Sequence, residues 1–328
     1  MANHKHMSEQ RRTQSRRAFL GKAVASGVAL RQGARNHRGS AELPRRTLGK
    51  TGEAVTILGL GCAYAGGGVD ETTTRKTIET ALEGGVRYFD SAPEYTQAEE
   101  RLGPVIKPVR DEVFLTTKTY AQDAVQAEND LTQALANLQT GHVDLFLQHG
   151  VGLDSVSDVH KMLGKGGSFE FLRKAKEQGR ARFIGMSVHA PHSVALELLR
   201  ASADWDVIMP FVNYVSHAQD GDALLTMARE RALGMVAMKV LGGNPGLLAD
   251  NYDRAFRYAL SVEGVACALI GVSNRHQVTR AVRAAREFRA LTPEEMTETL
   301  EIGRKQAENQ SAVVRTLDRH RQYGFRRA

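Results

Sequence analysis

The feature that most constrains this chain is a repeat of eight short apolar segments, each followed by a polar or amphipathic stretch. The apolar segments begin about 25 to 38 residues apart, and most are apolar almost throughout rather than alternating with polar residues. Continuous apolar strands are typical of parallel sheets that are buried on both faces. The eight segments are TILGLGCAY (56–64), VRYFDSA (86–92), VFLTTKTY (113–120), VDLFLQH (143–149), ARFIGMSVH (181–189), DVIMPFVNY (206–214), GMVAMKVLG (234–242) and ACALIGVS (266–273).

Eight such units in succession predict a closed (β/α)8 barrel, the TIM barrel of the α/β class. An open doubly wound sheet is the alternative, but it requires a GxGxxG turn after its first strand, and GLGCAYAGGG (59–68) lacks that spacing. Residues 49–52 (GKTG) predict the turn of an N-terminal hairpin that closes the bottom of the barrel. Thr292, followed by a proline and two glutamates, predicts an extra C-terminal helix. Helices between the strands are expected at 72–85, 127–140 and 193–203.

Residues 1–40 are predicted to be a leader, and residues 41–328 the barrel domain. SRRAFLGK (15–22) resembles the twin-arginine export signal, and a short, weakly apolar stretch follows it at 23–30. Three arginines come soon afterwards and no clear Ala-x-Ala cleavage site is visible, so a disordered basic tail is the alternative. The leader predicts a bacterial protein that the twin-arginine machinery exports to the periplasm; without a functional signal the protein would stay in the cytoplasm.

Composition argues against several classes of function. The net charge of +7 does not indicate nucleic-acid binding, because residues 1–46 hold 11 Lys/Arg and 2 Asp/Glu while the remainder holds 33 and 35. Two cysteines, Cys62 and Cys267, are too few for a disulfide framework, a zinc cluster or an iron–sulfur cluster. No apolar run reaches the roughly 18–20 residues needed to span a membrane, so no permanent span is expected.

Ionisable side chains stand at the ends of three consecutive predicted strands. Asp90 ends the second strand and Tyr95 lies in the loop after it, while Lys118 ends the third strand and His149 the fourth. In a (β/α)8 barrel the C-terminal ends of the strands form the active-site mouth. Each residue alone also fits a structural role, such as a turn cap or an ion-pair partner, but four matched positions favour a catalytic site.

These segments resemble the aldo-keto reductase family over about residues 43–290. FDSAPEYTQAEERLG (89–103) matches the family's Asp-Thr/Ser-Ala-x-x-Tyr stretch, and TTKTY (116–120) and LFLQHG (145–150) match its Lys and His strands. MKVLGG (238–243) and LIGVSNRHQV (269–278) match its cofactor loops. The resemblance implies reduction of a small aldehyde or ketone to an alcohol by hydride from NADPH, with NADH as the alternative cofactor.

The resemblance also implies a catalytic tetrad of Asp90, Tyr95, Lys118 and His149. Tyr95 would give a proton to the alkoxide, and because a free phenol has a pKa of about 10, we expect the Lys118 ammonium to lower the Tyr95 pKa. Asp90 would hold Lys118 charged, and His149 would polarise and orient the carbonyl. Loops set specificity in this fold, so the sequence specifies neither the substrate nor the oligomeric state.

The cofactor contacts implied by the resemblance are less complete. Ser187 would meet the nicotinamide, but Val188 follows it where the family usually has Asn, and Met209 stands where Gln is common; Asn213 is retained. Glycines let backbone amides approach a pyrophosphate, and a helix N-terminus favours phosphate. Arg275 or Arg280 would hold a 2′-phosphate. The full set of predicted contacts is Ser187, Asn213, Lys239, Leu241, Gly242, Gly243, Gly271, Ser273, Arg275 and Gln277.

Two other functions and a metal site remain as alternatives. The first is a nucleotide-binding regulatory or redox-sensing subunit with little turnover, which the departures at Val188 and Met209 leave open. The second is a lyase that uses Lys118 as a Schiff base, although Asp90 beside it predicts a charged amine rather than the depressed pKa this chemistry needs. His189, His192 and His217 indicate a metal site only weakly, because no cysteine or carboxylate completes the ligands.

Overall fold

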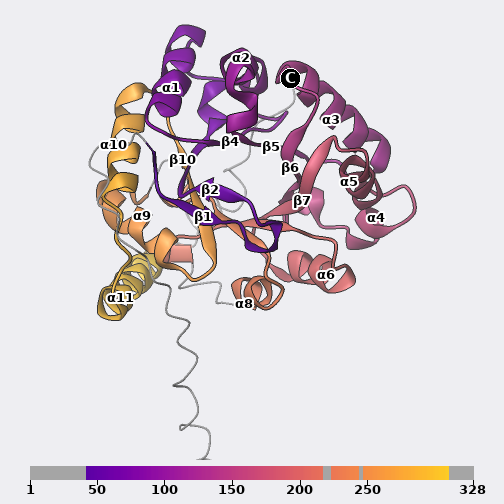
Figure 1. The fold of residues 1–328 in the computed structure, drawn as a ribbon. Coiled ribbons are helices and arrows are strands. Elements are labelled where there is room, and N and C mark those ends of the chain that lie inside the picture. The colour runs from indigo at the N-terminus through magenta and orange to yellow at the C-terminus, as the bar shows by residue number, and fades with distance from the viewer. Residues whose placement is uncertain (1–41, 217–222, 244–246, 310–328) are drawn as a thin grey trace, which may run out of the picture. The chain divides into compact units, whose positions relative to one another are not determined.

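The computed structural model describes residues 42–216, 223–243 and 247–309. Eight parallel strands close into a barrel with helices around it, as the repeat predicts (Figure 1). The strands follow the order β10-β3-β4-β5-β6-β7-β8-β9 around the ring. The (β/α)8 prediction is therefore confirmed, whereas the leader predicted at residues 1–40 lies outside the described residues.

All eight predicted strands are present. They are β3 (Leu58–Gly61), β4 (Tyr88–Asp90), β5 (Phe114–Thr119), β6 (Val143–Val151), β7 (Ala181–Val188), β8 (Val207–Pro210), β9 (Gly234–Ala237) and β10 (Val265–Gly271). The helices are α1 (Glu71–Glu83), α2 (Ala98–Ile106), α3 (Ala124–Asn137), α4 (Val159–Leu163), α5 (Ser168–Glu177), α6 (Ser193–Ala201), α8 (Ala223–Glu230), α9 (Tyr252–Ser261), α10 (Arg275–Arg286) and α11 (Pro293–Asn309).

The strands are apolar throughout because each of their faces packs against something different. In β6, Leu145 and Leu147 belong to the cluster that fills the barrel, whereas Phe146 between them packs on the helix side. The same alternation places Tyr88 inside and Phe89 outside in β4. Side chains of a strand alternate between faces with a period of two, so a strand covered on both sides needs apolar residues at every position.

Several strands end earlier than the apolar segments predict. The segment 56–64 becomes β3 up to Gly61 and then the short 3-10 helix η2 (Cys62–Ala65). Similarly, β9 ends at Ala237 and is followed by Lys239, which has a left-handed backbone with φ of 53°. The remaining apolar residues of these segments therefore belong to the loops that build the mouth rather than to the barrel wall.

A hairpin closes the bottom of the barrel, as predicted. β1 (Arg45–Thr47) pairs antiparallel with β2 (Ala54–Thr56), and the turn between them contains η1 (Gly49–Thr51). Leu48 is fully buried in the cluster that fills the barrel, and the Lys50 amide donates to the Ala232 carbonyl over 2.6 Å. Gly49 has φ of 50°, and a Cβ there would collide with the backbone of Leu233 and Gly234. The turn thus lies directly against the chain leading into β9.

The predicted C-terminal helix is α11, and its first turn is capped as the sequence suggests. The Glu295 amide donates to the Thr292 hydroxyl over 3.2 Å, while the Thr292 amide donates to the Glu295 carboxylate over 2.9 Å. This reciprocal pair is a capping box. The same carboxylate forms an ion pair of 2.7 Å with Arg257 of α9, which fixes α11 against the barrel's outer helices (Figure 1).

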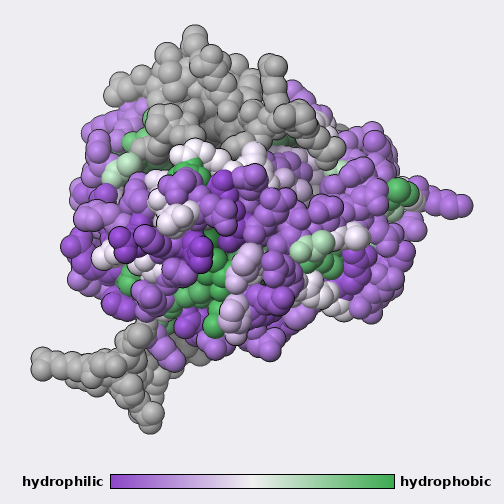
Figure 2. Space-filling view, turned by 90° about the horizontal axis from the view of Figure 1, so that it is seen from above, coloured by the Kyte–Doolittle hydropathy of each residue, from purple (hydrophilic) through white to green (hydrophobic). Residues whose placement is uncertain are grey.

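The exterior is polar where the helices face solvent. Figure 2 shows a face that is mostly hydrophilic, with hydrophobic residues in small patches between polar ones. Within the described residues, no helix combines the length and the apolar character needed to cross a lipid bilayer.

We predict that the bottom closure is a main source of stability. Leu48→Ala should lower the free energy of unfolding by about 2–5 kcal/mol, because it removes a fully buried side chain and leaves a cavity. Leu247→Ala makes the same change at a side chain that is 44% exposed and should cost less than about 1 kcal/mol. Urea unfolding of the two variants measures the difference; equal losses would contradict a structural role for the hairpin.

Candidate active site

The four predicted tetrad residues meet at the C-terminal end of the barrel. Lys118 Nζ lies 2.7 Å from Asp90 Oδ1 and 4.9 Å from the centre of the Tyr95 ring. The Tyr95 and His149 rings lie edge to face, 5.8 Å apart. Side chains alternate between the two faces of each strand, and this explains the convergence. Asp90, Lys118 and His149 point to the same inner face as the apolar residues that precede them in β4, β5 and β6.

Lys118 is almost completely buried, with its side chain 1% exposed, and the Asp90 side chain is 6% exposed. Its ammonium also donates to the Ser91 carbonyl over 2.7 Å. A buried charge is tolerated only when it is paired and hydrogen-bonded, and both conditions hold here. Asp90 and the Ser91 carbonyl therefore hold the Lys118 side chain in place.

One expectation about Tyr95 is wrong. The sequence predicts that Lys118 lowers the Tyr95 pKa, whereas in the structure the Tyr95 pKa lies well above its usual 10. Burial is the largest cause, and the nearby carboxylates of Asp90 and Glu94 add to it. Lys118 stacks over the ring and is paired with Asp90, so its charge does little to stabilise a phenolate. Tyr95 is thus firmly protonated at neutral pH.

Glu94 is part of the site, although it stands at a variable position of the Asp-Thr/Ser-Ala-x-x-Tyr motif. Its Oε2 lies 3.1 Å from His149 Nδ1, and the two side chains are only 7% and 4% exposed. Burial lowers the pKa of His149 below its usual 6.5, with Glu94 opposing this effect. The sequence does contain a signal for this role, because Glu94 directly precedes the predicted catalytic tyrosine in a loop at the barrel mouth.

The His149 ring is also held from its face. Tyr120 stacks on it with ring centres 4.0 Å apart and planes 7° apart. Gly150, which follows, has φ of 70°, and a side chain there would strike the Tyr120 ring. The ring of His149 is therefore fixed both in its plane, by Glu94, and along its normal, by Tyr120.

Lys239, predicted as a cofactor contact, lies close enough to the tetrad to interact with it electrostatically. Burial lowers its pKa to about 8, helped by repulsion from Lys118 and opposed by Asp90. Its carbonyl accepts from the Asn213 amide nitrogen over 3.0 Å. The mouth thus combines two lysines with two carboxylates, those of Asp90 and Glu94.

Of the two residues predicted to contact the nicotinamide, Ser187 has an unused hydrogen-bond donor, whereas the side-chain groups of Asn213 are already hydrogen-bonded. The Ser187 hydroxyl accepts from the Gly150 amide over 2.9 Å, which leaves its own proton available to a ligand. The Asn213 side chain donates to Lys239 and Ser216 and accepts from the amides of Val215 and Ser216. A nicotinamide contact by Asn213 would have to replace one of these bonds. Met209 faces the barrel interior.

On the predicted phosphate side, the N-terminus of α10 offers free donors. Asn274 caps the helix by accepting from the Gln277 amide over 3.0 Å, and Gln277 Oε1 accepts from the Ser273 amide over 2.7 Å. Among the described residues, the amides of Arg275 and His276 have no hydrogen-bond partner, as expected at a helix start. These amides fit an anionic phosphate oxygen.

The other predicted phosphate contacts are only partly available. Gly242 and Gly243 both have positive φ, 81° and 97°, but the Gly242 amide already donates to the Lys239 carbonyl over 2.8 Å. The Leu241 carbonyl likewise accepts from the Leu248 amide over 3.0 Å. Residues 244–246 of this loop lie outside the described residues. The Gly243 amide is therefore the described donor of this loop that best suits a phosphate.

The two arginines proposed for a 2′-phosphate differ in their surroundings. The Arg275 side chain is exposed at the start of α10, where it can reach an anion beside the helix N-terminus. The Arg280 guanidinium lies over the Tyr252 ring, 4.4 Å from its centre. This stacking places Arg280 against α9, so Arg275 is the better candidate of the pair.

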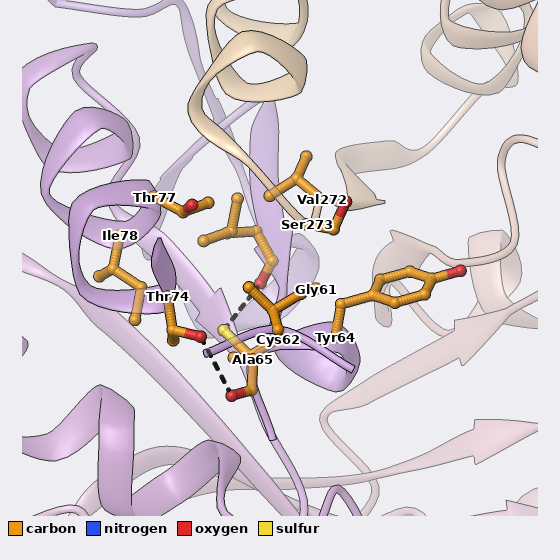
Figure 3. A pocket seen from close by; sticks show the side chains of 11 residues that line it. Gly61, Cys62, Tyr64, Ala65, Thr74, Thr77, Ile78, Val272 and Ser273 are labelled. Carbon is orange, nitrogen blue, oxygen red and sulfur yellow. Dashed lines mark hydrogen bonds between the residues drawn. The ribbon is translucent and has the colours of Figure 1, made fainter. Parts of the chain in front are cut away.

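A pocket of about 250 Å³, including its open mouth, lies at the ends of β3 and β10 (Figure 3). Side chains of α1, such as Thr74 and Ile78, face Val272 and Ser273 across it, and Cys62 lies between them. None of the four tetrad residues lines it. The pocket therefore adjoins the predicted phosphate loop at the ends of β3 and β10 rather than the reacting centre.

The histidine metal site receives no support from the described residues. No group of three or more His, Cys, Asp or Glu side chains there is arranged to hold a metal ion. His189 is buried, and His217 lies outside the described residues.

A further buried carboxylate, Glu99 of α2, lies behind the site. It accepts a hydrogen bond of 2.5 Å from the Thr117 hydroxyl of β5. Burial raises the pKa of Glu99 from its ordinary 4.5 to about 7. Glu99 is therefore partly protonated at neutral pH, unlike an exposed glutamate.

Comparison with known proteins identifies a sequence family and similar folds. Residues 57–255 match the sequence model of the aldo/keto reductase family. A pyridoxal 4-dehydrogenase from Microbacterium luteolum is 25% identical over 263 residues, which cover 66% of this chain and 75% of the relative. An aldo-keto reductase structure from Bacillus halodurans has a TM-score of 0.68 at 23% identity, covering 80% of this chain and 96% of the other. Another, from Klebsiella pneumoniae in complex with NADPH, has a TM-score of 0.65 at 20% identity and covers 79% and 95%.

We predict that Glu99 makes stability fall as pH rises. In the unfolded chain this carboxyl ionises near 4.5, but in the folded protein it ionises near 7, so its contribution is complete below pH 4.5 and is lost by about pH 7. The loss is roughly 3 kcal/mol. Glu99→Gln should therefore be more stable than the wild type at pH 8 and similar to it at pH 4.5 in urea unfolding. Glu100→Gln, an exposed neighbour, is the control; equal pH profiles for Glu99→Gln and wild type would contradict the prediction.

Proposed function

Because this chain belongs to the aldo/keto reductase family, a family of oxidoreductases, we propose that it reduces an aldehyde or ketone to an alcohol with NADPH. The observation that carries the proposal is the cluster at the barrel mouth of the buried Lys118, Asp90 and His149 with the partly buried Tyr95. A cluster of an ammonium, a carboxylate, a phenol and an imidazole suits proton transfer to a carbonyl oxygen. Small-molecule carbonyl compounds are the proposed substrates.

We propose that Tyr95 is the general acid. Its raised pKa keeps it protonated at neutral pH, so it has the proton that the developing alkoxide needs. Asp90 would hold Lys118 over the Tyr95 ring, which fixes the position of the phenol. His149 would orient the substrate oxygen against Tyr95.

The proposed cofactor is NADPH, which supplies the hydride that no side chain can. The residues that fit it are the Ser187 hydroxyl for the nicotinamide, the Gly243 amide and the first amides of α10 for phosphates, and Arg275 for a 2′-phosphate. A similar protein from Klebsiella pneumoniae was solved with NADPH, and this likeness supports the proposal.

The alternatives have less support. A lyase that uses Lys118 needs a nucleophilic neutral amine, whereas Lys118 is buried in an ion pair with Asp90. A regulatory barrel without turnover would not need a complete tetrad. We also propose that the protein is exported to the periplasm, and the leader sequence at residues 15–22 is the only support for this proposal.

Replacing Tyr95 tests the proposed proton donor. Tyr95→Phe should lower kcat for carbonyl reduction by about 10²–10⁴-fold, because it removes the general acid and little else. NADPH oxidation measured with a panel of aldehydes and ketones tests this, while NADPH fluorescence confirms that the cofactor still binds. Tyr64→Phe, an exposed tyrosine on the rim, is the control. A wild type that binds NADPH but reduces nothing would favour the regulatory alternative.

Replacing Arg275 tests the proposed choice of cofactor. Arg275→Ala should raise the Kd of NADPH by about tenfold, the effect of one lost charge-assisted hydrogen bond, and leave the Kd of NADH within about twofold. Arg283→Ala, in the last turn of the same helix, should change neither. Fluorescence titration with both nucleotides measures the constants. Equal weakening of NADPH and NADH would show that Arg275 does not contact a 2′-phosphate.

A further inference from the structure

Lys239 is held in an unfavourable backbone conformation in the loop after β9. Its φ is 53°, in the left-handed region that residues other than glycine rarely adopt. Its carbonyl oxygen accepts two hydrogen bonds, one from the Gly242 amide over 2.8 Å and one from the Asn213 side chain over 3.0 Å. These bonds fix the backbone of Lys239, and they therefore set the direction in which its side chain leaves the loop.

The Lys239 side chain reaches over the barrel opening. Its amine interacts electrostatically with Asp90 at the end of β4, with Lys118 in β5 and with His189 after β7. In the closed ring of strands, β5 lies directly opposite β9, the strand that precedes Lys239. An amine that acts on groups across the ring lies inside the mouth rather than on its outer rim.

The proposed nicotinamide site lies in the same part of the mouth. Ser187 belongs to β7 and Asn213 follows β8, and these two strands lead to β9 around the ring. A nicotinamide that contacts Ser187 and faces Tyr95 across the mouth would lie over the barrel opening. The amine of Lys239 would then be a direct neighbour of the nicotinamide ring.

The surroundings of Lys239 disfavour positive charge. Burial lowers the pKa of Lys239 to about 8, repulsion from Lys118 adds to this effect, and Asp90 opposes it. Because this pKa is above 7, Lys239 is still mostly charged at neutral pH. A second positive charge that enters the mouth beside this ammonium would be repelled by it, and the low polarity of a buried site strengthens the repulsion.

We propose that Lys239 makes the site select the reduced cofactor over the oxidised one. The proposal rests on the NADPH-dependent reductase function proposed above. The nicotinamide ring is uncharged in NADPH and positively charged in NADP⁺, whereas the rest of the two molecules is the same. Lys239 therefore repels NADP⁺ and not NADPH. This selection favours loading of the reductant and release of the spent cofactor, so it favours carbonyl reduction over alcohol oxidation.

A charge that acts on the ring can be distinguished from a charge that binds a phosphate. The phosphate groups are common to NADPH and NADP⁺, so the loss of a phosphate contact weakens the binding of both by the same factor. The ratio of the two Kd values therefore reports the groups that act on the nicotinamide ring.

Equilibrium binding without any carbonyl substrate tests the proposal. NADPH fluorescence gives the Kd of NADPH, and displacement of bound NADPH gives the Kd of NADP⁺. At pH 7 the wild type should bind NADPH at least about tenfold more tightly than NADP⁺, because two like charges about 10 Å apart in a protein repel by roughly this factor. The ratio should fall about tenfold in Lys239→Gln and in Lys239→Met, which are both uncharged.

Two further variants serve as controls. Lys239→Arg keeps the positive charge and should keep the wild-type ratio. Arg275→Ala removes the proposed contact to the 2′-phosphate, so it should raise both Kd values by the same factor and leave their ratio unchanged. Circular dichroism shows whether each variant is folded, and the wild-type ratio does not depend on any variant.

The possible outcomes separate this inference from the function on which it rests. Equal Kd values for NADPH and NADP⁺ in the wild type, or an unchanged ratio in both uncharged variants, would overturn the role of Lys239 and leave the reductase function intact. A wild type that binds neither nucleotide would overturn the proposed cofactor and this inference together. A wild type that selects NADPH through Lys239 but reduces no aldehyde or ketone would overturn the reductase function alone.

Discussion

The closure of eight short strands into one ring is the constraint on which the rest of the structure depends. Closure gives every strand an inner and an outer face, and the alternation of side chains then assigns each residue to one of them. The inward rows fill the barrel with Leu145, Leu147 and similar side chains, and the same rows continue upward into Asp90, Lys118 and His149. The active-site cluster is therefore a continuation of the core rather than an addition to its surface.

Burial determines the chemistry of this cluster more than pairwise attraction does. Lys118 and Asp90 neutralise each other across 2.7 Å, and the remaining charges are distributed so that each lysine lies near a carboxylate. Burial raises the Tyr95 pKa and lowers those of His149 and Lys239, which in each case favours the neutral form. The site thus holds a protonated phenol and a neutral imidazole at neutral pH, the states that donate and accept hydrogen bonds.

The sequence predicted the strands, the hairpin and the capped C-terminal helix because each depends on local pattern and turn chemistry. It also predicted the convergence of Asp90, Lys118 and His149, since strand ends meet at one mouth in this fold. It did not predict Glu94, whose contact with His149 depends on the path of the loop after β4. The prediction of a lowered Tyr95 pKa is wrong for a related reason. The sequence does not reveal how deeply a phenol is buried or which carboxylates approach it.

The hairpin at the bottom has a consequence for the electric field at the top. With Leu48 closing one end and apolar side chains filling the barrel, the charged groups at the mouth lie above a medium of low polarity. Such a medium screens the charge of Glu94 less than water would. A polar group that enters the mouth would therefore interact more strongly with Glu94 because the barrel below it is closed and apolar.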